Sequence, residues 1–269
     1  MSTPSKIILV TGASSGIGRA TANYLAKQGH TVYGAGRKFN QLEAIDEFIG
    51  LKMDVTEPDS IQSGLNLIIE KEAKIDVLIN NAGLGLAGPV EECHTKDFEA
   101  VMNTNVLGVL NMVQAVCPYL RRQNHGYIIN ITSIGAKFSL PFRGIYCASK
   151  SAVEAITEAL SMELRPFGIR VCTVAPGDVK TNINANRIHS SLEQSEYPNY
   201  KQVLQQINQE VNAGINPQVI GEKIEHIIQQ RKPKLHYRVA TPIQRISVWM
   251  KQLLPGRIFE RLIMNHYNV

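Results

Sequence analysis

The chain has 269 residues, 44% of them hydrophobic and 19% charged, the composition of a globular protein that can fill a sizeable core. No uninterrupted apolar run reaches the roughly 18 residues that a bilayer span needs, which argues against a membrane-spanning protein. The first residues, MSTPSKIILVTG, lack the hydrophobic region of a signal peptide, so we expect a cytoplasmic protein.

The net charge of +5 is concentrated near the C-terminal end. Residues 231–269 contain eight Lys or Arg and a single acid, Glu260, whereas residues 1–230 contain 20 basic and 22 acidic residues. A basic tail raises nucleic-acid binding as one alternative function. The cations are spread among apolar residues, however, and no motif that reads nucleic acids is present, so we expect no nucleic-acid partner.

The four cysteines are far apart in the sequence and form no C-x-x-C pair. This spacing argues against a zinc site and provides no disulfide framework. We therefore expect reduced thiols and no bound metal.

Strand-like and helix-like segments alternate along the first two thirds of the chain. Apolar, β-branched runs predict strands at 6–12, 30–36, 51–55, 77–80, 127–132 and 170–175. Helical patterns lie between them at about 17–28, 58–72, 95–122 and 147–166. This order predicts an α/β protein, a single-domain Rossmann-type doubly wound parallel sheet with helices on both faces.

The strand pattern thins after Ala175. A polar stretch at 178–200 is followed by segments that predict two or three helices and one short strand at 234–240. We expect a single domain, 1–269. Within it, 1–182 would be the cofactor-binding and catalytic core, and 183–269 a substrate loop and a helical C-terminal extension.

The stretch TGASSGIG at 11–18 directly follows the first predicted strand and opens the first helix. Its glycines, Gly12, Gly16 and Gly18, permit a tight turn and the close approach of a ligand to the backbone. The helix N-terminus presents unpaired N–H groups that suit a pyrophosphate. The placement predicts a dinucleotide site.

The end of the second predicted strand distinguishes the two nicotinamide cofactors. An acid here would bind a ribose 2′-hydroxyl, but the sequence is GAGRK, with Arg37 after Gly36. A guanidinium suits a 2′-phosphate. We expect NADP(H) to be favoured over NAD(H).

Tyr146 and Lys150 are four residues apart, so on a helix they share one face. An ordinary surface pair is the simplest interpretation of this spacing. The alternative is that the ammonium lowers the phenol's pKa, by up to ~3 units at close range, and so makes Tyr146 a useful proton carrier.

The chain resembles the short-chain dehydrogenase/reductase family over about residues 6–182. The motifs that carry the resemblance occur in the family's order and at its intervals: TGASSGIG at 11–18, DV at 54–55, NNAG at 80–83, NVLG at 105–108, ITS at 131–133, YCASK at 146–150, and PG at 176–177 with Thr181 following.

The resemblance implies a catalytic set of Asn105, Ser133, Tyr146 and Lys150. Tyr146 would transfer the proton, Lys150 would tune its pKa and hold the nicotinamide ribose, Ser133 would bind the substrate oxygen, and Asn105 would hold a water of a proton relay. The cofactor contacts that follow from the motifs are Gly12, Ser14, Ser15, Gly16, Ile17, Gly18, Arg37, Asp54, Val55, Asn81, Ala82, Gly83, Tyr146, Lys150, Pro176, Gly177, Val179 and Thr181.

The implied activity is an NADP(H)-dependent oxidoreductase that interconverts a secondary alcohol and a ketone, or an alcohol and an aldehyde. A non-catalytic nucleotide-sensing protein on the same fold is the alternative. The C-terminal part is most similar to the hydroxysteroid and retinol dehydrogenase branch, which suggests a lipophilic substrate.

The resemblance also implies a homodimer or homotetramer, with the helices at 95–122 and 147–166 at the subunit interface. Their apolar residues beyond one face are Met112, Val113, Val116, Ala155, Ile156 and Ala159. The alternative is that these residues pack on the sheet.

In the tail, apolar residues recur at helical spacing between cations, and Trp249 is the single tryptophan. The apolar positions are Ile243, Ile246, Met250, Leu253 and Leu254. Such a helix can lie in a membrane interface, cover a substrate pocket, or pack on the core. Contact with a membrane is the least expected of the three.

Overall fold

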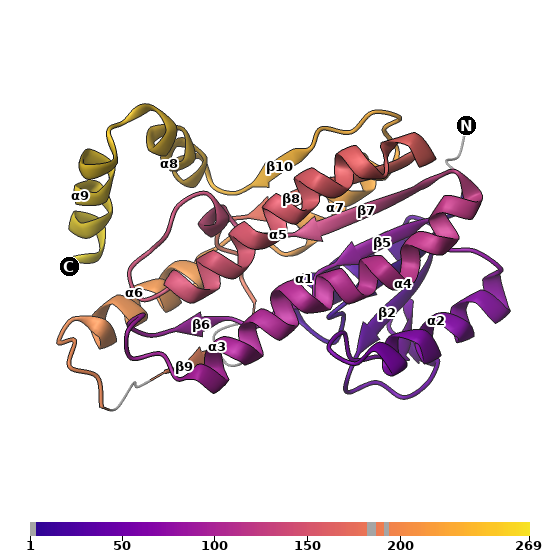
Figure 1. Ribbon diagram of the computed structural model, residues 1–269, viewed down its shortest axis with the longest axis horizontal. Helices are drawn as coiled ribbons and strands as arrows, with labels where there is room; N and C mark the ends of the chain where they lie inside the picture. Colours follow the sequence, from indigo (N-terminus) through magenta and orange to yellow (C-terminus); the bar gives the residue numbers. More distant parts are fainter. Residues whose placement is uncertain (1–3, 182–186, 191–193) are drawn as a thin grey trace.

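The computed structural model describes residues 4–181, 187–190 and 194–269. At its centre lies a sheet with the strand order β10-β8-β7-β5-β1-β2-β4-β3 (Figure 1). The strands are β1 (Ile7–Thr11), β2 (Thr31–Gly36), β3 (Glu43–Ile45), β4 (Phe48–Lys52), β5 (Val77–Asn80), β7 (Gly126–Ile131), β8 (Ile169–Pro176) and β10 (His236–Val239). All of these pairings are parallel except that of β3 with β4, which confirms the predicted doubly wound parallel sheet.

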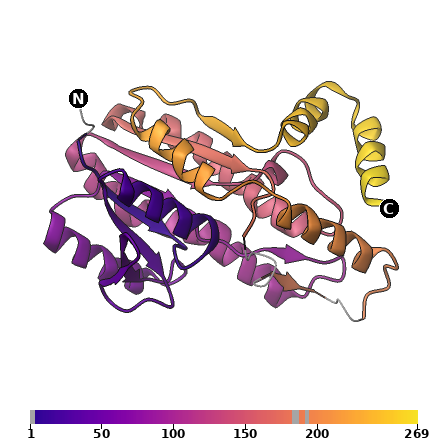
Figure 2. The same ribbon diagram turned by 180° about the vertical axis from the view of Figure 1, so that it is seen from behind.

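Helices cover both faces of the sheet. One face, toward the viewer in Figure 1, carries α2 (Pro58–Glu72), α4 (Gly108–Gln123) and α5 (Gly144–Glu163). The other, toward the viewer in Figure 2, carries α1 (Gly16–Lys27) and α7 (Gln218–Ile228). Each layer buries its own apolar cluster against the strands, so the sheet is fixed from both sides.

The strand predicted at 51–55 lies earlier, at Phe48–Lys52, and β3 was not predicted. Ile45 pairs with Phe48 across a two-residue turn, in which Asp46 has a φ of 47°. The chain leaves the sheet after Lys52, where the Asp54 carboxylate accepts a hydrogen bond from the Thr56 backbone N–H at 3.0 Å.

The helix predicted at 95–122 is one continuous run of three segments, two α-helical and one π-helical. It comprises α3 (Thr95–Met102), a π-helical turn at Asn103–Leu107, and α4. Residues 95–123 are long and apolar enough to cross a bilayer by composition. Met112, Val116 and Leu120 are nevertheless fully buried in the cluster on the sheet, as in the core helix of a globular protein.

The described residues after Thr181 contain four helices, whereas two or three were predicted. They are α6 (Tyr200–Asn212), α7, α8 (Pro242–Leu253) and α9 (Gly256–Tyr267). The predicted strand at 234–240 is present as β10. A small pair, β6 (Leu86–Ala87) with β9 (Ile188–His189), lies apart from the main sheet. Part of the predicted substrate loop, residues 182–186 and 191–193, lies outside the described residues.

Helices α8 and α9 form one end of the molecule and follow directly from the edge strand β10 (Figure 1). Val248 and Phe259 pack with Phe138 beneath them, and Tyr267 packs against α6. Thr241 and Gln244 form a reciprocal capping box at the start of α8, and the tail breaks into two helices at Pro255.

Candidate active site

The predicted site residues follow the carboxyl ends of neighbouring strands. β1 lies between β5 and β2, and the chain runs outward from β1 in both directions. In open parallel sheets this switch in strand order leaves a crevice where ligands bind. The glycine-rich turn follows β1, Asn81 follows β5, Ser133 follows β7 and Gly177 follows β8.

The turn after β1 needs glycine at two positions. Gly12 has a φ of +68°, and a Cβ there would lie 2.8 Å from the Ala82 Cα. A Cβ on Gly18 would overlap the Asn81 side-chain amide and the Gly12 carbonyl. The Asn81 amide donates to the Thr11 carbonyl at 2.9 Å and thereby holds the turn against the end of β5. The backbone is therefore open for the close approach of a ligand.

The N-terminus of α1 is suited to a pyrophosphate. Ser15 is at the N-cap, but its side chain makes no capping hydrogen bond, and the first turn of α1 contains no acid. A Cβ on Gly16 would lie 3.5 Å from the Thr181 side chain, which places Thr181 beside this helix end. Ser14 and Ile17 flank the same turn, and Ile17 also lines the cavity described below. The features fit a dinucleotide diphosphate.

Further predicted cofactor residues lie around this crevice. Arg37 is exposed just beyond β2, where a ribose 2′-phosphate would find a guanidinium rather than an acid. Asp54 is half-buried, and its carboxylate accepts a hydrogen bond from the Thr56 hydroxyl. Val55 is buried beside Gly108. Val179 is buried and pairs with Ile215.

Gly83 marks the point where three motifs meet. A Cβ there would lie 3.2 Å from the Asn105 Oδ1 and 3.4 Å from the Lys150 Nζ. The preceding Ala82 donates its backbone N–H to the Thr11 hydroxyl at 3.0 Å. The structure thus brings residues from three distant stretches of sequence to one place.

Asn105 is fully buried inside the π-helical turn. Its Oδ1 accepts from the Leu84 N–H at 2.7 Å, and its Nδ2 donates to the Leu84 carbonyl at 3.0 Å and to the Ser149 hydroxyl at 2.9 Å. Ser149 donates to the Tyr146 carbonyl at 2.7 Å. Asn105 therefore ties the loop after β5 to the first turn of α5. π turns are frequent at functional sites, and this one aims Asn105 inward.

Lys150 is buried, and its Nζ donates to the Ile131 carbonyl at the end of β7, at 2.9 Å. Burial lowers the pKa of Lys150 to about 8, because a charged ammonium is poorly solvated there. Lys150 is therefore held in one position, between the end of β7 and Gly83.

Tyr146 lies one turn earlier on α5, and burial raises the pKa of its phenol. The groups that oppose this rise are Arg143, Ser133 and Arg187. The Arg143 guanidinium lies 4.4 Å from the centre of the Tyr146 ring. In the protein alone, burial outweighs any lowering of the phenol's pKa, and Lys150 is not among the groups that oppose the rise. The Lys150 ammonium is hydrogen-bonded to the Ile131 carbonyl of β7, and the Arg143 guanidinium lies over the phenol ring.

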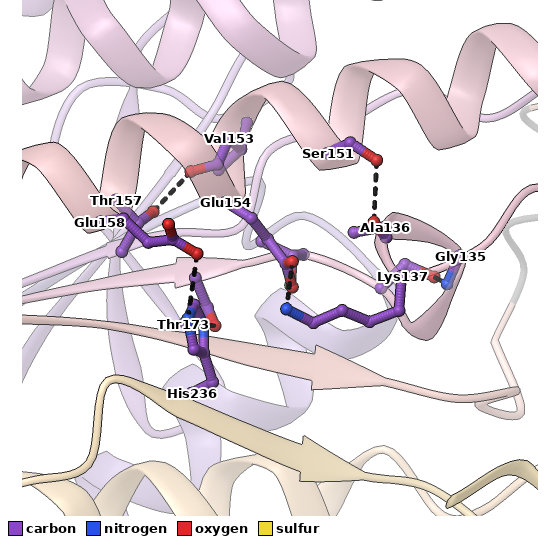
Figure 3. A network of polar contacts seen from close by, with 12 residues as sticks. Gly135, Ala136, Lys137, Ser151, Val153, Glu154, Thr157, Glu158, Thr173 and His236 are labelled. Atoms are coloured by element: carbon purple, nitrogen blue, oxygen red, sulfur yellow. Dashed lines mark hydrogen bonds and ion pairs between the residues drawn. The ribbon is translucent and has the colours of Figure 1, made fainter. Parts of the chain in front are cut away.

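Ser133 caps the 3-10 turn that follows β7, and its hydroxyl accepts from the Gly135 N–H at 3.1 Å. Figure 3 shows how this turn is fixed to α5. The Lys137 ammonium lies 2.6 Å from the Glu154 carboxylate, and the Ser151 hydroxyl donates to the Ala136 carbonyl at 2.9 Å. Because Glu154 and Ser151 are on the helix that carries Tyr146, these contacts keep Ser133 and the phenol in fixed relation.

A cavity of about 530 Å³ begins at these groups and extends beneath the C-terminal helices. Ser133, Tyr146 and Gly177 line its inner end, and Pro176 and Thr181 lie beside them. Its remaining wall is mainly apolar and includes Leu140 and residues of α6, α8 and α9. The apolar lining residues of those helices are Ile207, Val211, Ile243, Met250, Phe259, Leu262 and Ile263.

Four charged residues of the cavity wall were not predicted: Arg143, Asp178, Arg187 and Glu210. Arg143 and Arg187 are 9% and 5% exposed, and Asp178 accepts a hydrogen bond from the Gln244 amide. Burial raises the pKa of Asp178 and lowers that of Arg187 to about 10. Arg143 could have been found from the sequence, because it lies three residues before Tyr146 on the same helix face. Asp178 and Arg187 lie in segments without a periodic pattern, and Glu210 is on α6.

Comparison with known proteins agrees with this geometry. Residues 6–191 match the family model described as short chain dehydrogenase. The chain belongs to the short-chain dehydrogenase family. A 3-ketodihydrosphingosine reductase of Bacteroides thetaiotaomicron is 39% identical over 267 residues, which cover 98% of each chain.

Solved structures of this family share the fold. A short-chain dehydrogenase/reductase from Burkholderia phymatum in complex with NAD has a TM-score of 0.80 and 26% identity, covering 94% of each chain. A serine dehydrogenase complexed with NADP+ has a TM-score of 0.76 and 26% identity, covering 87% of this chain and 94% of the other. The protein is an oxidoreductase that acts on CH–OH groups with a nicotinamide cofactor.

Proposed function

We propose that this dehydrogenase is an NADP(H)-dependent reductase of a lipophilic ketone, with Tyr146 as the proton donor. The observation that carries the proposal is the mainly apolar cavity that ends at Tyr146 and Ser133. A long hydrocarbon chain would fill its outer part, and the ketone would lie at the inner end. NADPH, when bound, supplies the hydride to the carbonyl carbon.

The roles of the protein groups follow from their positions. Ser133 would donate a hydrogen bond to the substrate oxygen and orient the carbonyl. Tyr146 would give its proton to that oxygen as the negative charge develops. A raised pKa keeps the phenol protonated at neutral pH, which suits the direction of reduction. Lys150 would hold the cofactor ribose, and Asn105 would keep the first turn of α5 in register with the loop after β5.

The relative from Bacteroides suggests a substrate class. Its name specifies 3-ketodihydrosphingosine, which is a long-chain ketone with an amino alcohol head. In the present chain, Asp178 lines the cavity and could face such an ammonium. We therefore propose a long-chain amino ketone as the substrate, with Arg37 holding the cofactor 2′-phosphate.

The test combines cofactor binding with a set of matched ketones. NADPH should raise the melting temperature more than NADH does. NADPH consumption should be fastest with the long-chain amino ketone, slower with a ketone of equal length that lacks the amino group, and slowest with a short β-keto ester. Asp178→Asn should raise KM for the amino ketone and leave KM for the amine-free ketone unchanged. Equal rates with all three ketones would contradict the substrate class.

We also propose that the protein works in the cytoplasm as a homodimer or homotetramer. The four free thiols suit a reducing compartment. Leu110 of α4 and Met162 of α5 are 36% and 71% exposed, and large apolar side chains in such positions suit a subunit interface.

A further inference from the structure

We propose that the outer surface of α8 and α9 docks on an anionic lipid bilayer. Seven large apolar side chains on these two short helices are at least 41% exposed. They are Ile243, Ile246, Trp249, Leu253, Ile258, Leu262 and Met264. Ile243 and Leu262 also line the substrate cavity, so the outer surface itself consists of the other five. The surface of a globular protein rarely gathers so many without a partner.

On α8, the exposed residues form one row. Ile246, Trp249 and Leu253 are spaced by three and four residues, so they share a face, and they are 56%, 58% and 78% exposed. Val248, on the opposite side of the helix, is 1% exposed and packs with Phe138. The helix is therefore apolar on the side away from the protein as well as on the side toward it. Folding alone does not need the outer row.

This arrangement differs from the sequence-based expectation that the apolar stripe of the tail would face the protein. Ile243, Ile246 and Leu253 were expected on that stripe, and all three are more than half exposed. The inward contacts are made instead by Val248 and, in part, by Met250 and Leu254. Val248 lies outside the stripe, so the periodicity of the five apolar positions did not identify the buried side.

Charge favours a lipid surface over a second copy of the chain. Residues 231–269 have eight cations and one acid, and Arg245, Lys251 and Arg261 are exposed on the same two helices. Two such surfaces would repel each other, whereas an anionic leaflet attracts each cation. An exposed tryptophan, with the Arg238 guanidinium 5.5 Å from its ring centre, is also typical of an interfacial helix.

The docking surface lies on the helices that close the substrate cavity. Ser247 and Met250 of α8 line the cavity, while Ile246, Trp249 and Leu253 do not. A ketone dissolved in the leaflet would therefore meet α8 and α9 before it reached Tyr146. The docking claim itself does not depend on the identity of the substrate, because it stands on exposure and charge.

The test is flotation of the purified full chain with lipid vesicles. Wild-type protein should float with vesicles that contain phosphatidylglycerol, remain mostly unbound with phosphatidylcholine alone, and dissociate at high salt. The triple variant I246S/W249S/L253S should lose at least about tenfold in binding, because it removes the apolar row. In the wild type, anionic vesicles should shift the emission of Trp249, the single tryptophan, to shorter wavelength.

Two controls make the result specific. The variant V90S/V219S changes two exposed apolar residues on other elements and should bind as the wild type does. The triple variant should keep wild-type turnover of a short, water-soluble ketone, which shows that it is folded and separates docking from catalysis. Absence of binding to anionic vesicles, or equal loss in both variants, would overturn the proposal. The proposal would also be overturned if sedimentation showed that the wild type self-associates and the triple variant does not.

Discussion

Lys150 carries its ammonium inside the protein, against the Ile131 carbonyl. Its pKa of about 8 in the folded chain is below its ordinary value of 10.5. Between these two values the unfolded chain binds the proton and the folded chain does not. The free energy of unfolding contributed by this residue therefore rises with pH from about 8 to about 10.5.

We expect the stability difference between wild type and Lys150→Met to show this slope. Relative to the variant, the wild type should gain about 3 kcal/mol across that window, because one pKa unit corresponds to about 1.36 kcal/mol. Urea unfolding at a series of pH values measures it. Taking the difference removes the contribution of other groups that titrate there, such as Cys172, whose pKa burial raises to about 12. A flat difference would show that Lys150 titrates normally.

The Arg143 guanidinium lies over the Tyr146 ring, and its charge opposes the effect of burial on the phenol. Arg143→Gln should raise the pKa of Tyr146 further. In the direction of alcohol oxidation, which needs the phenolate, the rising limb of the pH profile should move to higher pH. Arg143→Lys should restore most of the wild-type profile. If the rising limb of the pH profile were at the same pH in Arg143→Gln as in the wild type, Arg143 would have only a structural role.

At the residue scale, the sequence predicted which motifs lie together at the site but not which of their side chains contact one another. Gly83, Asn105 and Lys150 do lie together. The direction of the Lys150 ammonium depends on the register of β7 against α5, which no local pattern contains. For the same reason, spacing alone suggested a Tyr146–Lys150 interaction, whereas the ring is in fact beside Arg143.

At the scale of elements, periodicity located most strands and helices because β-branched runs and amphipathic stretches have different repeats. It missed β3, which is three residues long, and the π turn at Asn103–Leu107. A single added residue in a turn does not interrupt a helical pattern. The turn is visible only in the backbone geometry of the folded chain, where it places Asn105 against Leu84.

The prediction on cofactor choice is based on the residues at the end of β2. Arg37 is exposed there and follows Gly36, with no acid at the end of the strand. Arg37→Asp replaces a phosphate partner with a repelling charge, so the ratio of kcat/KM for NADPH over NADH should fall by at least about tenfold. Arg19→Gln, which removes an exposed ion pair with Asp46, is the matched control and should leave the ratio unchanged. A ratio unaltered by Arg37→Asp would place the 2′-phosphate elsewhere.

At the scale of the whole molecule, sequence analysis expected a C-terminal extension and gave a cover over a substrate pocket as one of three alternatives for its tail, and residues of α8 and α9 do line the cavity. This arrangement requires α6, α8 and α9 to pack around Phe138 and Leu140, which are distant in sequence. The predicted subunit interface also needs correction. Met112, Val113 and Val116 are buried against the sheet, so they are unavailable to another subunit. Of the other predicted interface residues, Ala155 is exposed and Ile156 and Ala159 are half-buried, so these three stay candidates.

Oligomerisation through α4 and α5 remains a prediction, now assigned to their exposed apolar residues. Introducing charges with Leu110→Glu and Met162→Glu should convert the oligomer to a monomer of 29.8 kDa, because a like charge from each subunit would be buried at the interface. Sedimentation at micromolar concentration measures the mass. Val90→Glu, at another exposed apolar position, should leave the oligomer intact. A wild-type protein that sediments as a monomer would refute the interface.

The central claim is that Tyr146 gives a proton to a ketone at the inner end of the cavity while NADPH is consumed. The most direct measurement compares the turnover of NADPH with a long-chain ketone by the wild type and by Tyr146→Phe, together with the NADPH dissociation constant of each. The account predicts steady turnover by the wild type, a loss of about 10²–10⁴-fold in the variant, and equal cofactor affinity. A variant that retained more than about a tenth of the wild-type turnover would contradict it, since an acid–base group contributes more than this.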